Sequence, residues 1–371
     1  MFHGSLVPCA ERRIIKMKVN VLLLNSIIIS LISGCTFFPD VEVDDISHIE
    51  SEIYNPAYTE CMDDDMTKTQ IFNNKNNFLV RETTDGFFLC GPIDDKLGIY
   101  YKDNNADIWK LCCEGTCILG PIFDNYLYFL SADFENNKIL MERIDVESLK
   151  KEVLCTSSIL SFDNIAIYSN LLIVYSGNDL SNGIVFEIDE NNRVSQGYTI
   201  FESMISNEFT EGEYRISADY KQIYYVDNND YHEVYRFNPF ECSYQYINRV
   251  DNIELLTEEG IVFSHNKYLY LLDGLSGDIE KISKIEDDFV LVNYSDNCYY
   301  VLLTKQNNVE ELVCINSDGT SKHIYNFENV VFPARLCISV LDNKILYYDN
   351  TMQKIYSIDT ENGIAKLVSN L

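Results

Sequence analysis

Residues 345–359 read ILYYDNTMQKIYSID, two short apolar and aromatic runs on either side of a polar turn. β-Branched and aromatic residues of this kind favour strands, and a short polar segment between two such runs is typical of a hairpin. Residues 261–273, IVFSHNKYLYLLD, repeat the arrangement and also end in an aspartate. The two stretches therefore predict copies of one β-hairpin.

The hairpin recurs along the chain after residue 80. Its first strand has an aliphatic residue, any residue and an aromatic residue, and the copies lie at 99–101, 127–129, 173–175, 223–225, 261–263, 298–300 (Cys298 in the aliphatic position) and 345–347. Its second strand ends in an acid or amide, at Asp145, Asp189, Asn238, Asp273, Asn316 and Asp359, with a weaker first copy at 108–111. The mean spacing is about 41 residues, in the range of repeat architectures.

A unit of this length with up to four strands is typical of a propeller blade, which buries its faces against the neighbouring blades. We therefore predict an all-β fold, a β-propeller of about seven blades over residues 76–371. Six complete blades plus a partial one is the alternative, because the first interval spans only 28 residues. We expect a strand at 77–81 to complete the last blade beside residues 364–368, and the abundant Tyr and Phe to fill the space between blades.

The N-terminal residues have the pattern of an export signal: the basic segment KMK at 16–18, an apolar run and then small residues. The apolar run is too short for a comfortable membrane span of about 20 residues. Its end, ISGC at 32–35, resembles the lipobox of bacterial lipoproteins, in which the cysteine is acylated and becomes the new N-terminus. A short uncleaved anchor is the alternative.

These features predict the order of the N-terminal segments. Residues 1–34 are expected to be a signal peptide, with Met17 as the true start and 1–16 as a mis-assigned extension. Cys35 is the expected lipidation site, and residues 35–75 form an acidic tether. The expected location is the outer face of the cell membrane, where two acyl chains give stable anchoring.

The balance of charge excludes one class of partner. The chain has 58 acidic and 28 basic residues and a net charge of −30, which becomes about −33 without residues 1–34. Nucleic-acid binding depends on clustered cations that neutralise phosphates, so we predict no nucleic-acid partner. An anionic membrane face also repels such a chain, and the membrane contact is therefore expected to be made by the lipid on Cys35.

Ten cysteines remain when Cys9 and Cys35 are set aside. Five of them lie in apolar, strand-like runs and are predicted to be small buried hydrophobic residues: Cys90, Cys155, Cys298, Cys314 and Cys337. The others do not form paired C-x-x-C elements, which argues against a zinc ribbon.

The segment WKLCCEGTC at 109–117, together with the repeated Tyr-Tyr and Ile-Tyr-x-Ile-Asp strands, resembles exported lipoproteins of Gram-positive, largely gut-dwelling anaerobes with DUF5050-like propellers, a family of unknown function. The resemblance covers about residues 80–370 and implies the same fold. In that family the cysteine element continues into a histidine and a further cysteine. Here the chain continues as ILGP at 118–121, so the resemblance assigns these cysteines no metal or disulfide role.

The sequence contains no nucleophile elbow, P-loop, dinucleotide-binding fingerprint or zinc-protease helix motif. The three histidines within the repeats, His232, His265 and His323, fall in different blades. Strands predicted to begin the blades and face the central channel lie at 86–89, 165–168, 214–217, 252–256, 289–293 and 336–340. Their candidate channel-lining residues are Arg215, Glu254, Asn293 and Arg335; each arginine would suit a carboxylate or sugar acid, or a neighbouring acid of the protein.

Aspartates followed by glycine after the second strand, as at 273–274 and 318–319, predict turns. These segments lack the alternating acids and closing glutamate of a calcium loop, so we predict no cofactor, with calcium as the minor alternative.

The predicted function is that of a cell-surface lipoprotein whose propeller binds a peptide, glycan or envelope protein. The alternative is an extracytoplasmic hydrolase or lyase acting on polysaccharide or peptide at the channel mouth, and a sensor with a membrane partner is a third option. A cluster of His, Arg, Tyr and acids at the channel mouth would favour the enzyme, whereas an apolar or charge-paired channel would favour the binding module.

Overall fold

The computed structural model of the chain describes residues 79–369 apart from short gaps at 134–135, 137, 158–161, 163, 178, 196–198, 206–211, 218–219, 228–231, 296–297, 305–308, 329–337, 342–343 and 350–351. The predicted signal peptide, Cys35 and the predicted tether lie outside the described residues. None of the described residues belongs to a helix with the length and apolar character of a membrane span.

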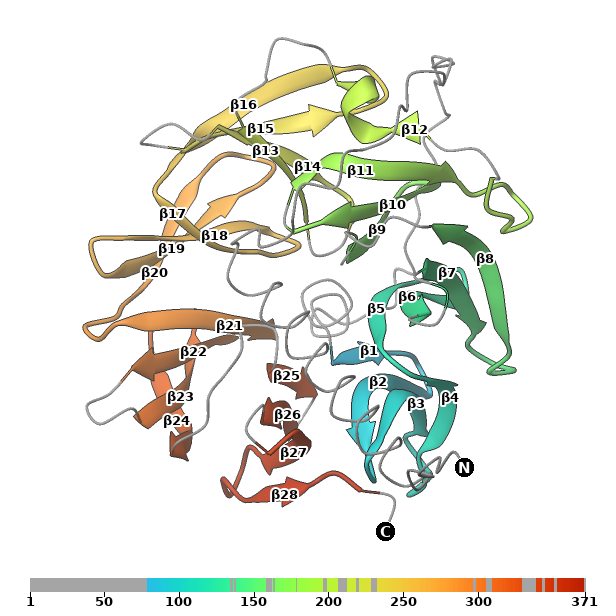
Figure 1. Cartoon of the computed structure of the whole chain (residues 1–371). Helices are drawn as coiled ribbons and strands as arrows, with labels where there is room; N and C mark the ends of the chain where they lie inside the picture. The colour runs from blue at the N-terminus through green and yellow to red at the C-terminus, as the bar shows by residue number, and fades with distance from the viewer. Residues whose placement is uncertain are drawn as a thin grey trace, which may run out of the picture. The chain divides into compact units, whose positions relative to one another are not determined.

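The described strands form seven antiparallel sheets of four strands, and one continuous stretch of chain builds each sheet. Figure 1 shows the sheets around a common centre, with the colour passing from blue in the first sheet to red in the seventh. The fold is therefore a β-propeller with seven blades, as predicted, and the alternative of six blades plus a partial one is wrong.

We number the blades in chain order and give the innermost strand of each blade first. Blade 1 contains β1 (Val80–Glu82), β2 (Gly86–Ile93), β3 (Lys96–Asp103) and β4 (Lys110–Glu114). Blade 2 contains β5 (Cys117–Phe123), β6 (Tyr126–Asp133), β7 (Lys138–Asp145) and β8 (Lys151–Ser157). Blade 3 contains β9 (Asn164–Tyr168), β10 (Leu171–Ser176), β11 (Asp179–Glu187) and β12 (Thr199–Ile200), and the 3₁₀ helix η1 (Phe201–Met204) follows β12. Blades 4 and 5 contain β13 (Gly212–Ile216), β14 (Ile223–Asp227), β15 (His232–Asn238), β16 (Ser243–Val250); and β17 (Asn252–Leu256), β18 (Gly260–His265), β19 (Tyr268–Asp273), β20 (Ile279–Lys284). Blades 6 and 7 contain β21 (Phe289–Ser295), β22 (Cys298–Thr304), β23 (Val309–Asn316), β24 (Ser321–Glu328); and β25 (Ile338–Leu341), β26 (Lys344–Asp349), β27 (Lys354–Asp359), β28 (Ala365–Leu367).

The first blade differs from the prediction by one strand. The aliphatic-x-aromatic run at 99–101 belongs to β3, the third strand, whereas in the other blades the corresponding run lies in the second strand. The second strand of blade 1 is β2, which was expected to be channel-facing at 86–89. The innermost strand is β1, whose three residues are too few to show a pattern. This shift explains the short first interval.

The closure of the ring also differs from the prediction. Residues 80–82 form β1 and pair with β2, so they complete the first blade and not the last. The last blade has its own fourth strand, β28, which pairs with β27. Blades 1 and 7 meet instead through packing of β2 against β27.

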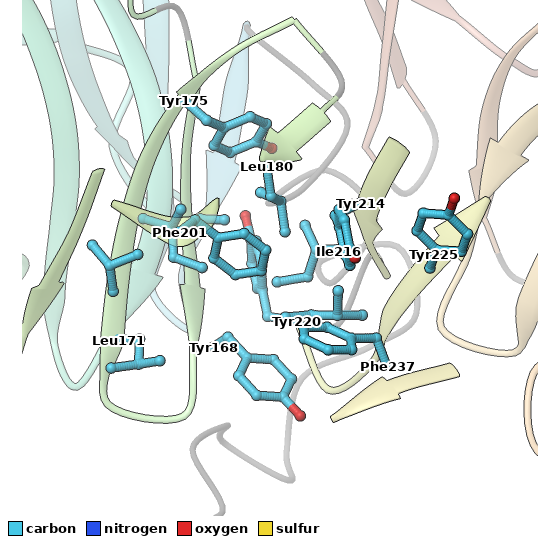
Figure 2. Close-up of a cluster of buried hydrophobic side chains, with 14 residues drawn as sticks. Tyr168, Leu171, Tyr175, Leu180, Phe201, Tyr214, Ile216, Tyr220, Tyr225 and Phe237 are labelled. Carbon is cyan, nitrogen blue, oxygen red and sulfur yellow. The ribbon is translucent and has the colours of Figure 1, made fainter. Parts of the chain in front are cut away.

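The apolar core lies between adjacent blades, because each described cluster of buried side chains draws on two consecutive blades. Figure 2 shows the cluster between blades 3 and 4, where the rings of Phe201, Tyr214 and Phe237 meet edge to face. Tyr128 and Tyr224 are among the largest fully buried side chains. The prediction that the aromatic residues fill the space between blades is confirmed for these residues.

The aspartate that ends the third strand shapes the following turn in several blades. In blade 5, Oδ1 of Asp273 accepts hydrogen bonds from the amides of Leu275 and Ser276 at 2.9 and 2.6 Å. Asp359 accepts in the same way from the amides of Glu361 and Asn362 in blade 7. The carboxylate thus accepts the hydrogen bonds that the turn amides would otherwise donate to water. This explains why the repeat keeps an acid or amide at this position.

Candidate functional site

The innermost strands of the blades surround the centre of the ring, and three of the predicted channel-lining residues lie on them. Arg215 is in β13, Glu254 in β17 and Asn293 in β21. Arg335 lies outside the described residues. The three side chains therefore come from the consecutive blades 4, 5 and 6, as the positions of the repeats predicted.

Arg215 forms an ion pair within its own strand. Its Nη2 is 2.6 Å from Oε2 of Glu213, two residues earlier, and Nε donates to the same oxygen at 3.0 Å. The arginine and glutamate side chains are 23% and 33% exposed. A neighbouring carboxylate therefore already occupies part of the guanidinium that would recognise an acidic ligand.

Glu254 and Asn293 also contact the protein framework. Oε1 of Glu254 accepts a hydrogen bond from the hydroxyl of Ser264 in the next strand of the same blade, at 2.9 Å. Asn293 is buried; its Nδ2 donates to the carbonyl oxygen of Ile338 in blade 7 at 3.2 Å, and its Oδ1 accepts from the amide of Tyr294. Asn293 thus joins two blades, as buried amides usually do when their partners are backbone groups.

Arg81, a further polar residue on an innermost strand, was not among the predicted channel-lining residues. It lies in β1 with only 3% of its surface exposed. Its guanidinium donates to the carbonyl oxygens of Val80 at 2.7 Å, Leu119 at 2.8 Å and Gly120 at 2.6 Å. The last two acceptors belong to β5, so this buried cation ties blade 1 to blade 2.

Groups from other blades act electrostatically on Arg81. Burial lowers the pKa of its guanidinium to about 10, and Tyr220, Cys90 and Tyr175 oppose this shift. Tyr220 lies in the turn after β13, in blade 4, and Tyr175 lies in β10, in blade 3. Burial also raises the pKa of Tyr220, so its phenol stays protonated. The only feature of the sequence that pointed to Arg81 was the scarcity of cations in an acidic chain. Because β1 is so short, the sequence did not show that Arg81 lies on an innermost strand.

The three histidines of the repeats stay in separate blades. His232 begins β15 and contacts the carbonyl oxygen of Asp227. His265 ends β18 and pairs with the carboxylate of Asp251. His323 lies in β24 near Asn326. Among the described residues, no group of three or more His, Cys, Asp and Glu side chains is arranged to hold a metal ion.

The fold is that of a seven-bladed β-propeller in which Arg81, Arg215, Glu254 and Asn293, on innermost strands, each contact other groups of the protein. No protein-family model matches the sequence, and no curated protein matches it either.

Solved structures of other propellers are similar to this chain. One is the β-propeller domain of the Trilobed protease from Pyrococcus furiosus, with 13% identity, a TM-score of 0.47 and coverage of 79% of this chain and 96% of that chain. An oligogalacturonate lyase from Vibrio parahaemolyticus has 8% identity, a TM-score of 0.47 and coverage of 79% and 86%. An acylaminoacyl peptidase has 12% identity, a TM-score of 0.49 and coverage of 81% and 53%, so this chain spans about half of its length. At these identities the likeness concerns the fold alone.

Proposed function

We propose that the protein is a lipoprotein, anchored through Cys35 to the outer face of the cell membrane, whose propeller binds a peptide, glycan or envelope protein. The observation that carries the proposal is the state of the central polar groups. Arg81, Arg215 and Asn293 contact carbonyl or carboxylate oxygens of the protein itself. Polar groups held in this way by oxygens of the protein itself suit a rigid scaffold that presents its loops to a partner.

The turns after the third strands offer a surface for a partner. In antiparallel four-stranded blades built in the same order, these turns all lie at one face of the ring. Five of them carry an aspartate whose pKa is lowered by hydrogen bonds from the turn: Asp145, Asp189, Asp273, Asp318 and Asp359. These carboxylates stay ionised even in mildly acidic surroundings, and they belong to a chain with a net charge of −30. Complementarity of charge therefore favours a partner segment rich in Lys and Arg.

The test is a binding titration of the purified protein with an oligolysine peptide, with an oligoglutamate peptide as the control and an uncharged oligosaccharide as the probe for a glycan partner. We expect oligolysine to bind, with an affinity that falls as salt screens the charges. At a peptide concentration of about 100 times the dissociation constant, the unfolding transition should gain about 2.7 kcal/mol.

A matched pair of variants separates this face from general acidity. Asparagine at the five turn positions keeps the oxygen that accepts the turn amides and removes the charges, and we expect it to weaken oligolysine binding by about tenfold. Asparagine at Asp94, Asp95, Asp287 and Asp288, which lie in turns and linkers at the other face, should change the affinity little. Equal effects of the two sets, or turnover of a peptide or glycan by the purified protein, would contradict the proposal.

A further inference from the structure

Two cysteine side chains touch where blade 1 passes into blade 2. Cys113 lies in β4 and Cys117 begins β5. Gly115, between them, has a φ of 116°, a conformation that favours glycine and returns the chain towards Cys113. The two Sγ atoms are 3.8 Å apart. A disulfide bond measures about 2.05 Å, so rotation of the two side chains has only a short distance to close.

A lysine and a buried acid lie beside this pair. Nζ of Lys151, in β8, is 3.7 Å from Sγ of Cys113 and 2.8 Å from Oε1 of Glu142, in β7. Glu142 is fully buried, whereas the Lys151 side chain is 39% exposed. The ammonium group therefore neutralises a buried carboxylate and faces a thiol, and its exposed part marks the side from which solvent reaches the pair.

The two thiols differ in acidity. The hydrogen bond that Cys117 donates lowers the pKa of Cys113, burial raises it, and Lys151 lowers it further, with a net downward shift. The same hydrogen bond and burial raise the pKa of Cys117 well above its usual value. One sulfur is thus favoured as a thiolate while its neighbour keeps its proton, which is the division between an attacking and a resolving thiol.

The neighbouring cysteines lack this environment. Burial raises the pKa of Cys90 to about 12 and that of Cys112 to about 11. Sγ of Cys90 donates to the carbonyl oxygen of Cys117 at 3.1 Å, and Sγ of Cys112 lies near the carbonyl oxygen of Lys110. None of the eight cysteines in the described part of the chain is in a disulfide. The environment of Cys113 therefore differs from that of its two neighbours.

We propose that Cys113 and Cys117 form a reversible dithiol–disulfide pair that reacts with hydroperoxides. The Cys113 thiolate attacks the peroxide; an S–O bond forms as the O–O bond breaks, and sulfur is oxidised to a sulfenic acid while hydroxide leaves. This hydroxide takes up from solvent the proton that Cys113 released on forming the thiolate, and so becomes water. Sγ of Cys117 then attacks the sulfenic sulfur, the S–S bond forms, and hydroxide leaves with the Cys117 proton as a second water. A reducing dithiol reverses the change by two exchange steps and is itself oxidised to a disulfide.

The geometry explains why a small oxidant suits this pair. Cys113 is only 6% exposed, so a peroxide is small enough to reach its sulfur past Lys151, whereas a larger dithiol or disulfide reaches the pair only on local opening of the chain. The disulfide would link β4 to β5 and so fasten the outermost strand of blade 1 to the innermost strand of blade 2. The site therefore connects an oxidation event with the contact between two blades.

The experiment treats the reduced full-length protein with hydrogen peroxide, alkylates the remaining thiols and digests the product with trypsin. Residues 111–138 form one peptide that contains Cys112, Cys113 and Cys117 and no internal Lys or Arg. We expect this peptide to lose the mass of two hydrogens and to keep a single alkylated cysteine, Cys112, and dithiothreitol should restore three alkylated cysteines. The substitutions Cys113→Ser and Cys117→Ser should abolish the bond, whereas Cys112→Ser should leave it intact.

Lys151 gives a second, kinetic test. Lys151→Gln should slow disulfide formation at neutral pH by about tenfold, the effect of one unit in the pKa of the attacking thiol. Lys151→Arg should restore the rate, and Lys150→Gln, at an exposed neighbour, should not change it. Because Lys151 also neutralises Glu142, the double substitution with Glu142→Gln preserves folding if the single one does not. The proposal is overturned if exposed Cys242 is oxidised while the 111–138 peptide stays reduced, or if the rate does not depend on Lys151.

Discussion

Gly91 in β2 and Ile355 in β27 approach so closely that a Cβ atom built on Gly91 would lie 2.5 Å from Cδ1 of the isoleucine. Ile355 is fully buried. The two residues belong to the first and last blades, and among the described residues no strand is shared between these two blades. In the described part of the chain, this contact therefore lies where blades 1 and 7 are held together by packing of β2 against β27 and not by a shared strand.

Gly91→Ala should destabilise the protein through this seam. The added methyl group overlaps Cδ1 of Ile355, and overpacking of this kind costs about 1–3 kcal/mol. Ile355→Val alone should cost about 1 kcal/mol, because it deletes that methyl group. In the double variant the overlap is absent, so chemical denaturation should show a total loss smaller than the sum of the single losses. Strictly additive losses would contradict the close contact.

Arg81→Met should lower the unfolding free energy by about 3 kcal/mol. The substitution removes the hydrogen bonds that the guanidinium donates to the carbonyl oxygens of Leu119 and Gly120, and loss of a buried hydrogen bond to a charged group costs about 1.5–3 kcal/mol. Arg215→Met, which breaks a partly exposed pair with Glu213, should cost no more than about 1 kcal/mol. Urea denaturation of the two variants measures the difference, and equal losses would show that Arg81 does not join the blades.

Because of its turn aspartates, we expect the free energy of unfolding of the protein to fall in acid. Hydrogen bonds from Ser276 and Leu275 lower the pKa of Asp273 in the folded state below its value in the unfolded chain. The folded state therefore binds fewer protons, so this contribution is present above the unfolded pKa of about 3.9 and disappears as the pH falls through the folded pKa.

Thermal unfolding between pH 6 and pH 3 checks this dependence. Asp273→Ala should lower the unfolding free energy at pH 6 by about 1 kcal/mol and reduce its change with pH, whereas Asp273→Asn should retain most of the stability through the amide oxygen. The assignment would be contradicted if the stability of the wild-type protein stayed constant as the pH is lowered below about 4.

Phe201→Ala should be among the most damaging single substitutions in the core between blades 3 and 4 (Figure 2). The ring is fully buried and meets Tyr214 and Phe237 edge to face, so its removal leaves a cavity at a cost of about 4 kcal/mol. Phe201→Leu fills most of that space and should cost about 1.5 kcal/mol. Met352→Ala, at a side chain that is 56% exposed, is the control and should stay within about 0.5 kcal/mol of the wild type in the same calorimetric measurement.

Cys35→Ser should release the protein from the membrane fraction. The hydroxyl group cannot carry the thioether-linked lipid, and an anionic membrane face repels a chain with a net charge of −30. Fractionation of producing cells, with metabolic labelling by a fatty acid, gives the result. Unchanged membrane association of the serine variant would show that another segment anchors the chain.

The repeat predicted the fold because each blade carries its own hairpin signal. Aliphatic and aromatic residues recur where a strand must fill the space between blades, as at 345–347, and an acid recurs where the turn needs an acceptor, as at Asp273. These are local requirements, and the sequence shows them directly. The first blade was shifted by one strand because β1 has three residues and little apolar pattern.

The centre of the ring was harder to predict because it depends on contacts across long sequence separations. Arg81 donates to residues 38 and 39 positions later, and Asn293 donates to a residue 45 positions later. The placement of Arg215, Glu254 and Asn293 on innermost strands followed from the repeat. Their partners did not, because register and blade order decide which carbonyl or carboxylate lies within reach.

Each blade is a single contiguous stretch of chain, and this bears on how the chain tolerates being cut. A circularly permuted protein that begins at any linker between blades, for example at residues 285–288 between β20 and β21, would still contain seven complete four-stranded sheets. In a propeller that borrows a strand from the opposite terminus, the shared blade is complete only when the two ends of the chain come together. Here the position of the termini is therefore free to vary among the seven seams, and the pairing of strands does not depend on where the polypeptide begins.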